Sequence, residues 1–414
     1  IVGVGDGSNG PVEDIVDMKL NDVVKKIRGK RGTTVRLEVD PADNSGRKTI
    51  AITRDRIELK DSEARSEIIE RGTKVDGTKY RLGVIQLPSF YMDMDGARMG
   101  REDFKSTTRD VRRLLEEFKT KNVDGVVIDL RWNGGGSLTE AVNMTGLFID
   151  DGPVVQVKGP DGRTQPYKDP EAGLVWEGPL VVIINKFSAS ASEIFAGAIQ
   201  DYRRGIVIGD HATHGKGTVQ QLFDLDQKLL PLGSGGPRMG ALKLTIQQFY
   251  RPGGDSTQNR GVVSDVELPS LTTHLDVGES DLDYALKFSR VNPLQHDVYH
   301  MVDSNIIDGL RQRSQQRIGQ SEYFTKANRQ ITRYEEQKDR KTITLNKEKF
   351  LAERKELDSD KEQEELFENM TDPTRPVYEM DGYGQEAIDI TIDYLDLLGG
   401  NKVAVARQDT AVAQ

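Results

Sequence analysis

Three alternate serines, Ser188, Ser190 and Ser192, are the residues in this sequence whose type and spacing first suggest chemistry. They follow the apolar run Leu180–Ile184 and lead into the small-residue run Ala191–Ile199, so the sequence predicts a strand that passes directly into a helix. A serine at such a junction lies beside free backbone N–H groups, where a helix start favours negative charge. One hydroxyl could act as a nucleophile, although helix capping and packing would by themselves explain all three.

A lysine between two glycines supplies the base that a serine nucleophile needs. Gly215-Lys216-Gly217 lies in the loop between the apolar run Ile206–Ile208 and the predicted strand Thr218–Leu222. Apolar surroundings lower the pKa of a lysine, and its neutral amine can act as a general base. A serine hydroxyl is barely ionised at neutral pH and requires such a base. The sequence therefore predicts a serine–lysine pair, which is more specific than either feature alone.

Three consecutive glycines follow another predicted buried strand. The stretch Asp129–Gly136 reads Asp-Leu-Arg-Trp-Asn-Gly-Gly-Gly and continues the apolar run Val126–Leu130. Bare backbone N–H groups in such a loop can stabilise a developing oxyanion, usually the largest electrostatic contribution to acyl transfer. A tight turn with positive φ would explain one of these glycines but hardly three.

The elements that must position these loops alternate between about residues 61 and 270. The predicted strands are Tyr80–Leu87, Val126–Leu130, Leu180–Ile184, Ile206–Ile208 and Gly240–Tyr250, and the predicted helices are Arg101–Thr120, Leu138–Leu147 and Ala191–Ile199. Short uninterrupted apolar strands separated by helices favour an α/β (α+β) fold, with a mixed β-sheet covered by helices on both faces.

The sequence of residues 1–60 predicts a small β-rich module. Asn21 is a candidate cap for a helix over Asp22–Arg28, and Thr33–Val39 and Lys48–Thr53 alternate as the strands of a hairpin around a polar turn at residues 40–47. The apolar residues at helical spacing in and beside this helix are Leu20, Val23, Val24 and Ile27.

The composition changes beyond about residue 272. Residues 301–370 carry 29 charged side chains in 70, which is typical of solvent-rich helices. The sequence predicts a charge-rich helical domain over residues 273–400, with a break at Asp372–Pro376 and a last amphipathic helix over Gln385–Leu398. Residues 401–414 are predicted to form a disordered tail.

Length and composition exclude several classes of protein. A chain of 414 residues with an average apolar content predicts two or three globular domains and excludes collagen, wholesale disorder and a membrane bundle. The net charge of −10 leaves no global basic field for nucleic acid, and the absence of cysteine removes disulfides and thiol catalysis. The chain opens on Ile1 without a Met, so we expect it to be part of a longer precursor.

Several motif matches fail on context. Gly5–Gly10 fits G-x-G-x-x-G but lacks the following helix, and Gly209–Thr218 misses the phosphate-loop spacing. Ser45–Lys48 fits S-x-x-K but falls in a hairpin turn. His211 and His214 lack the carboxylate pattern that a metal site would need.

The motifs that remain resemble one known family. Asp129–Gly136, Phe187–Glu193 and Gly215–Gln220 resemble the C-terminal processing peptidases, specifically the tail-specific protease group of Gram-negative bacteria, which are serine proteases with a PDZ domain and a Ser–Lys pair. The resemblance covers nearly the whole chain and includes Gln200-Asp201-Tyr202 and Phe249-Tyr250-Arg251.

The resemblance implies a role for individual residues. It makes Ser190 the nucleophile, Lys216 the general base and Gln220 the residue that orients the amine of that base. The residues implied for the oxyanion hole are Gly135, Gly136 and the N–H of Ala191, and those implied as support are Glu193, Asp201 and Thr213. The loop Gly209–His214 is one residue longer than the family's usual stretch.

The resemblance also implies an architecture and a setting. Residues 61–272 would form a crotonase-like or ClpP-like protease core, and residues 1–60 the C-terminal half of a PDZ domain, with Leu20, Val23, Val24 and Ile27 along its peptide groove. It implies no metal or cofactor, no nucleic acid and no membrane span. It implies protein substrates bound through apolar, unstructured C-terminal tails, an adaptor protein as a further partner, and a periplasmic location peripheral to the inner membrane.

Two other functions stay open at this point. One is hydrolysis of a different acyl substrate on the same fold. The other is an inactive binding scaffold, because the strand and carboxylate-binding loop of a complete PDZ domain would precede Ile1. Cleavage of a protein that depends on its C-terminal tail would distinguish the protease from both.

Overall fold

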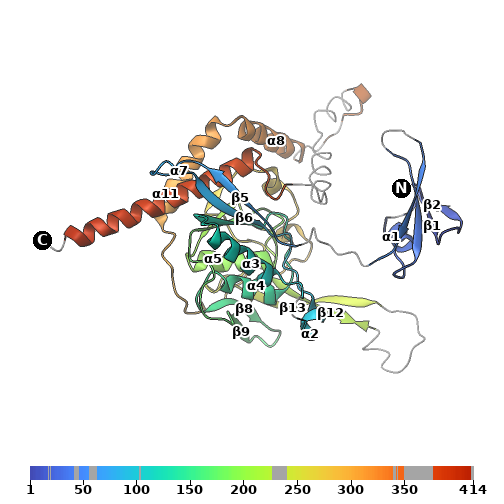
Figure 1. The fold of residues 1–414 in the computed structure, drawn as a ribbon, viewed down its shortest axis with the longest axis horizontal. Coiled ribbons are helices and arrows are strands. Elements are labelled where there is room, and N and C mark those ends of the chain that lie inside the picture. The colour runs from blue at the N-terminus through green and yellow to red at the C-terminus, as the bar shows by residue number, and fades with distance from the viewer. Residues whose placement is uncertain are drawn as a thin grey trace. The chain divides into compact units, whose positions relative to one another are not determined.

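The computed structural model describes residues 1–16, 18, 20–41, 46–55, 63–101, 104–225, 240–338, 342, 344–348 and 376–411. The chain divides into two compact units, Ile1–Lys60 and Asp61–Gln414, and each is described by itself (Figure 1). Residues 42–45 of the predicted turn, 372–375 of the predicted break and 412–414 of the predicted tail lie outside the described residues. Among the described helices, none is both long and apolar enough to cross a bilayer.

The first unit is an antiparallel four-stranded sheet with one helix. The strands, in the order β2-β1-β3-β4, are Val12–Asp14, Gly3–Asp6, Thr34–Val39 and Lys48–Thr53. The predicted hairpin is confirmed, with Thr34 paired to Thr53 and Val39 to Lys48. Helix α1 spans Leu20–Ile27. Asn21 therefore lies inside the helix, contrary to the prediction that it caps the helix.

The second unit is built on a six-stranded sheet in the order β14-β11-β10-β7-β6-β5. Its strands are β5 Arg65–Arg71, β6 Tyr80–Gln86, β7 Gly125–Asp129, β10 Leu180–Ile184, β11 Ile206–Gly209 and β14 Val266–Glu267. All neighbours pair in parallel except β5, which pairs antiparallel with β6 at one edge. The mixed sheet predicted from the sequence is confirmed.

Helices cover both faces of this sheet (Figure 1). In β10, Leu180, Val182 and Ile184 belong to one apolar core, and Val181 and Ile183 belong to another. The first core is completed by α3 Thr107–Thr120, α4 Leu138–Gly146 and α5 Ala191–Asp201. The second is completed by α7 Ser304–Gln320, α8 Glu322–Lys338 and α11 Gly382–Ala411. Because successive strand residues face opposite sides, a continuous apolar run requires two covered faces, as predicted.

A smaller antiparallel sheet, β12-β13-β8-β9, lies in the same unit. Its strands are β8 Pro153–Lys158, β9 Thr164–Lys168, β12 Thr218–Asp224 and β13 Ala241–Tyr250. Strand β12 begins two residues after Lys216, and its register with β13 shifts between Val219 and Gln220. Shorter elements are α2 Met94–Arg98 and the 3₁₀ turns Leu271–His274 and Glu279–Asp281.

Helices α3 and α11 also differ from their predicted bounds. Helix α3 begins at Thr107 and not at Arg101, because the hydroxyl of Ser106 caps it by accepting a hydrogen bond from the Arg109 N–H at 3.4 Å. Helix α11 continues to Ala411, through most of the predicted tail. The C-terminal helices also form one layer of the second unit, since apolar residues of α7, α8 and α11 pack on the sheet.

Candidate active site

The three loops singled out in the sequence leave neighbouring parallel strands of the six-stranded sheet. Strands β7, β10 and β11 lie side by side and end at Asp129, Ile184 and Gly209. Because parallel strands present their carboxyl ends at one edge, the glycine loop, the serine loop and the lysine loop emerge together. This arrangement brings residues that are far apart in the sequence to one place.

Ser190 differs from its two neighbouring serines. The Ser188 hydroxyl donates to the Leu130 carbonyl at 2.8 Å, and the Ser192 hydroxyl donates to the Asn133 carbonyl at 2.9 Å, both from fully buried positions. Ser190 instead lines a cavity of about 330 Å³. Its φ of 58° is a strained value for a residue other than glycine, as occurs where a turn exposes a reactive side chain.

The buried carboxyl group of Glu193 joins the serine loop to the lysine loop. Its Oε1 accepts hydrogen bonds from the Thr213 hydroxyl at 2.6 Å and the Gly215 N–H at 2.8 Å. Its Oε2 accepts from the Ser190 N–H at 2.7 Å and the Lys216 N–H at 2.9 Å. One side chain therefore fixes the separation of the two backbones that carry the serine and the lysine.

Burial also determines the ionisation of this carboxyl group. Desolvation raises the pKa of Glu193 to about 7, although all four of its hydrogen-bond donors favour the carboxylate. The folded state therefore favours the protonated acid more than the unfolded chain does. The resulting contribution to stability is present below the ordinary pKa of 4.5 and is lost as the pH rises through about 7.

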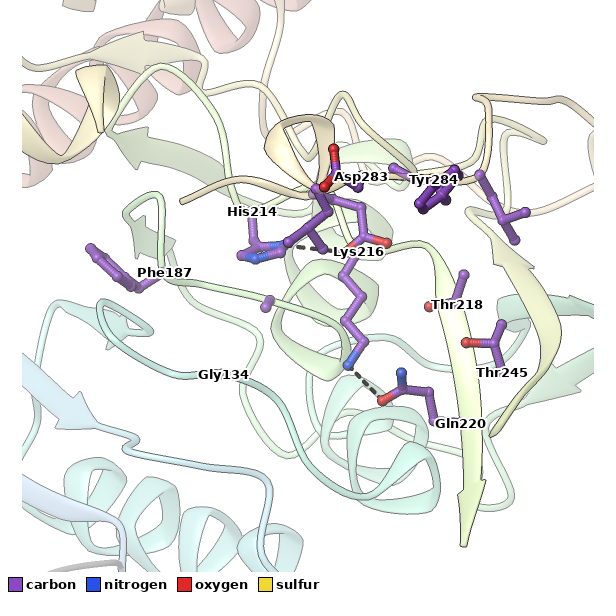
Figure 2. Close-up of a pocket in the computed structure, with 14 residues that line it drawn as sticks. Gly134, Phe187, His214, Lys216, Thr218, Gln220, Thr245, Asp283 and Tyr284 are labelled. Atoms are coloured by element: carbon purple, nitrogen blue, oxygen red, sulfur yellow. Dashed lines mark hydrogen bonds and ion pairs between the residues drawn. The ribbon is translucent and has the colours of Figure 1, made fainter. Parts of the chain in front are cut away.

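The amine of Lys216 lies inside the site, beside the side chain of Gln220. Its Nζ donates a hydrogen bond to Oε1 of Gln220 at 3.2 Å (Figure 2). Burial lowers the pKa of Lys216, and the positive charge of Lys243 lowers it further, while Glu279 and Glu193 oppose the shift. The environment thus favours the neutral amine that a general base requires.

Two cavities meet at Lys216. The smaller, of about 330 Å³, contains Ser190 and Ala191, and the larger, of about 790 Å³, contains Phe187 and His214. The residues that line both cavities are Gly134, Lys216, Thr218 and Gln220. The serine and the lysine therefore share one cavity, which opens beside a second and larger one.

The glycine loop packs directly against the serine loop. Gly135 has a φ of 102°, and a Cβ at this position would lie 2.8 Å from both the Ala189 carbonyl oxygen and the Ser190 Cβ. The N–H of Gly135 donates to Oδ1 of Asn133 at 2.9 Å. In this structure the N–H is directed at Asn133, and Gly135 also allows the close approach of the two loops. Its role in the oxyanion hole stays a prediction.

The other predicted oxyanion donors do lie at the cavity. Gly136 and Ala191 line the smaller cavity, together with Gly134, which the sequence reasoning did not select. A Cβ at Gly136 would lie 2.2 Å from the Phe90 carbonyl oxygen, so only glycine fits at that position.

Asp201, one of the predicted supporting residues, is not brought to the site. It is the last residue of α5, whereas Ser190 precedes the first. Its carboxylate pairs with Arg251 and accepts a hydrogen bond from the Gly253 N–H at 2.8 Å. Asp201 therefore holds the far end of the helix.

Aromatic stacking, which the sequence reasoning missed, links the glycine and serine loops. The ring of Trp132 stacks on that of Phe187 at a centroid distance of 4.4 Å. The backbone N–H groups of both residues donate to Oδ1 of Asn185, at 3.0 and 3.1 Å. An asparagine directly after a buried strand is the signal that could have indicated this link.

The two histidines of the lysine loop have separate partners. His211 Nδ1 lies 2.9 Å from Glu267 Oε2, and His214 Nδ1 lies 3.9 Å from Glu279 Oε2. Burial lowers the pKa of His214. Among the described residues, no group of three or more potential ligands could hold a metal ion.

Two of the predicted peptide-binding residues of α1 pack toward the core of the first unit. Val23 and Ile27 pack into the core of the first unit, Val24 is half-buried, and the side chain of Leu20 lies outside the described residues. The cavity of about 590 Å³ in this unit is lined mainly by polar and charged side chains, among them Lys26 and Arg54. The structure therefore directs Val23 and Ile27 toward the core, and a role of α1 in peptide binding stays a prediction.

Two parts of the chain match known protein families. Residues 81–268 match the family described as "Peptidase family S41", and residues 272–396 match the "C-terminal domain of tail specific protease". The chain is 39% identical over 354 residues to the tail-specific protease of Haemophilus influenzae, which covers 84% of this chain and 47% of that protein. It is 33% identical to the carboxy-terminal-processing protease of Bartonella bacilliformis, with 65% of this chain and 56% of that protein covered.

The chain thus spans about half the length of these curated relatives. A solved structure titled photosystem II D1 C-terminal processing protease matches with 26% identity and a TM-score of 0.41, over 65% of this chain and 62% of that one.

Proposed function

Because residues 81–268 match peptidase family S41, we propose that the chain belongs to this family and is a serine endopeptidase with Ser190 as nucleophile and Lys216 as general base. The observation that carries the proposal is that these two residues line one cavity while their backbone N–H groups bind the same oxygen of Glu193. The lowered pKa of Lys216 supports its role, because only the neutral amine can accept the proton of the serine hydroxyl.

The reaction proceeds through an acyl-enzyme. Ser190 Oγ attacks the scissile carbonyl carbon while its proton passes to Lys216 Nζ. The carbonyl electron pair moves onto oxygen, where the N–H groups of Gly136 and Ala191 would stabilise it. The C–N bond then breaks, and Lys216 returns the proton to the leaving amine. Water attacks the acyl-enzyme in the same way and regenerates both side chains.

Two further residues act by positioning. Gln220 accepts a hydrogen bond from the Lys216 amine and so directs it along the cavity. Glu193, held also by Thr213, keeps the serine and lysine loops in register. Neither side chain needs to exchange a proton with the substrate.

The substrates we propose are proteins with apolar, unstructured C-terminal tails. The names of the relatives, "tail-specific" and "carboxy-terminal-processing", support this class. The β-rich first unit would represent the C-terminal half of a PDZ domain, residues 61–272 the protease core and residues 273–400 its helical extension. A periplasmic location and an adaptor protein complete the proposal, and both rest on the family resemblance alone.

Cleavage of one unfolded protein with two different tails tests the proposal. The full chain is incubated with a version ending in apolar residues and with a version ending in charged residues, beside the Ser190→Ala variant. We expect cleavage of the apolar-tailed protein only, and none by Ser190→Ala at unchanged melting temperature. Equal cleavage of both would refute tail recognition, whereas binding without cleavage would establish a scaffold. Hydrolysis of small esters without any proteolysis would establish a different acyl hydrolase.

A further inference from the structure

We infer that the segment Glu279–Leu286 forms one wall of the substrate cleft and selects an apolar side chain next to the scissile bond. The inference rests on the proposed function, because the cleft adjoins the proposed base. It concerns the choice of cleavage site along the substrate, which is separate from recognition of the substrate's tail.

The segment is attached to the lysine loop on both sides of Lys216. The backbone N–H of Glu279 donates to the His214 carbonyl at 2.9 Å. The Gln258 amide donates to Oε1 of Glu279 at 3.0 Å, and its own Oε1 accepts from the Gly217 N–H at 2.9 Å. The position of the segment is therefore set by the same loop that positions the base.

The segment presents apolar side chains at the mouth of the larger cavity. Leu282 and Leu286 are 57% and 45% exposed, and both line this cavity together with Ala285. Figure 2 shows Phe187 on one side of Lys216 and Tyr284 on the other. Exposed apolar side chains that gather at one cavity, rather than singly over a surface, indicate a binding site.

The size and position of the cavity favour an extended polypeptide as its occupant. Its volume of about 790 Å³ is in the usual range of ligand sites, roughly 300–1,000 Å³. Another part of its lining comes from the β12 and β13 residues Thr218, Gln220 and Thr245. Because Lys216 and Gln220 also line the cavity of Ser190, an occupant here is continuous with the bond under attack.

Two carboxyl groups in the lining of the cavity disfavour an acidic substrate residue beside them. Glu279 and Asp283 both line it, and the Glu279 side chain is only 12% exposed. His214, on the same wall, has a pKa lowered by burial and adds no compensating positive charge at neutral pH. A substrate carboxylate placed here would meet like charges, whereas an apolar side chain would contact Leu282 and Leu286.

The test uses substrates that share one apolar C-terminal tail and differ only at the cleavage region, which is leucine-rich in one and aspartate-rich in the other. We expect the wild-type chain to prefer the leucine-rich substrate at least tenfold in kcat/KM. The double variant Leu282→Asp/Leu286→Asp should lose at least tenfold on that substrate. The matched control is Leu244→Asp, whose side chain is similarly exposed at 43% but lines neither cavity, and it should cleave normally.

A second variant and a chemical probe distinguish failure of this inference from failure of the proposed function. Asp283→Lys, at an exposed position, should improve cleavage of the aspartate-rich substrate. Labelling of the serine by a small fluorophosphonate reports on the serine–lysine pair alone. If the wild-type chain neither labels nor cleaves, the proposed function fails. If the wild-type chain is labelled and cleaves, and the Leu282→Asp/Leu286→Asp and Asp283→Lys variants cleave both substrates as Leu244→Asp does, the inference is wrong. It is also wrong if the cleft variants lose labelling as much as cleavage, because the segment would then shape the catalytic pair and not select the substrate.

Discussion

The amine nitrogen of Lys216 lies 3.2 Å from the amide oxygen of Gln220 and donates a hydrogen bond to it. Both residues line the two cavities that meet at the proposed active site. Gln220 is neutral, so it orients the amine without adding the negative charge that would keep a lysine protonated. The behaviour of these two side chains gives the most direct tests of the chemistry.

Replacing Lys216 by arginine should abolish proteolysis. Arginine keeps the length and positive charge of the side chain but does not lose its proton near neutral pH, so it cannot act as the base. We expect Lys216→Arg and Lys216→Met to lose at least about 10³-fold in kcat/KM, with melting temperatures close to that of the wild type. Activity of Lys216→Arg within tenfold of the wild type would show that the lysine acts only through its charge.

Replacing Gln220 by glutamate should move the pH profile upward. The neutral amine is the active form, so kcat/KM should rise with pH through the lowered pKa of Lys216. A carboxylate in contact with the amine favours its charged form and raises this pKa, so the rise should occur about one pH unit higher in Gln220→Glu. Gln220→Met, which adds no charge, should lower kcat without that upward movement. Superimposable pH profiles of kcat/KM for the wild type, Gln220→Glu and Gln220→Met would exclude Lys216 as the titrating base.

Two neighbouring glycines should respond differently to alanine. At Gly135, an alanine Cβ would meet the Ala189 carbonyl oxygen and the Ser190 Cβ at 2.8 Å, in a backbone conformation with φ of 102°. We expect Gly135→Ala to lose about 1–3 kcal/mol of stability and at least tenfold in kcat/KM. A Cβ at Gly134 meets no heavy atom within 4 Å, so Gly134→Ala should unfold at the wild-type temperature. Denaturant and thermal unfolding of both variants, compared with the wild type, check whether only Gly135→Ala loses stability.

Removal of Arg131 should destabilise the second unit strongly. Its guanidinium donates three hydrogen bonds to the carboxylate of Asp129, which is 5% exposed, and lies about 5.5 Å from the rings of Tyr378 and Tyr383. Arg131→Met leaves that carboxylate buried and unpaired, at a cost of about 3–5 kcal/mol. The double variant Asp129→Asn/Arg131→Met removes both charges and should recover a large part of the loss in thermal unfolding. Additive losses would show that the pair is not coupled.

The strands and the convergence of the three loops could be predicted because both follow from local patterns. The run Leu180–Ile184 is apolar at every position, which requires a strand buried on both faces, and the structure forms β10 over the same residues. The serine and lysine each stand in the loop after such a strand, and parallel order then places them at one edge. Chemistry that depends on residue type and strand order is readable from one sequence.

Features that depend on a single side-chain contact could not be predicted. The start of α3 is set by the Ser106 hydroxyl, which also donates to the buried carboxyl group of Glu140 at 2.8 Å, a contact between residues 34 positions apart. The Gly135 N–H is occupied because the Asn133 side chain turns back onto it. The packing of α11 on the sheet could not be predicted, since the spacing of residues such as Ile388 and Ile390 indicates an apolar helix face but not the element that covers it.

The second face of the six-stranded sheet is completed by residues that are translated long after its strands. Strands β5, β6 and β7 are made within the first 129 positions, whereas Ile388, Ile390 and Tyr394 of α11 cover them from the other end of the chain. During synthesis the growing polypeptide therefore exposes an apolar sheet face until almost all of the sequence shown has left the ribosome. The order of translation thus delays completion of the second apolar core, and a chain released early would carry the serine and the lysine without the layer that covers this face of the sheet.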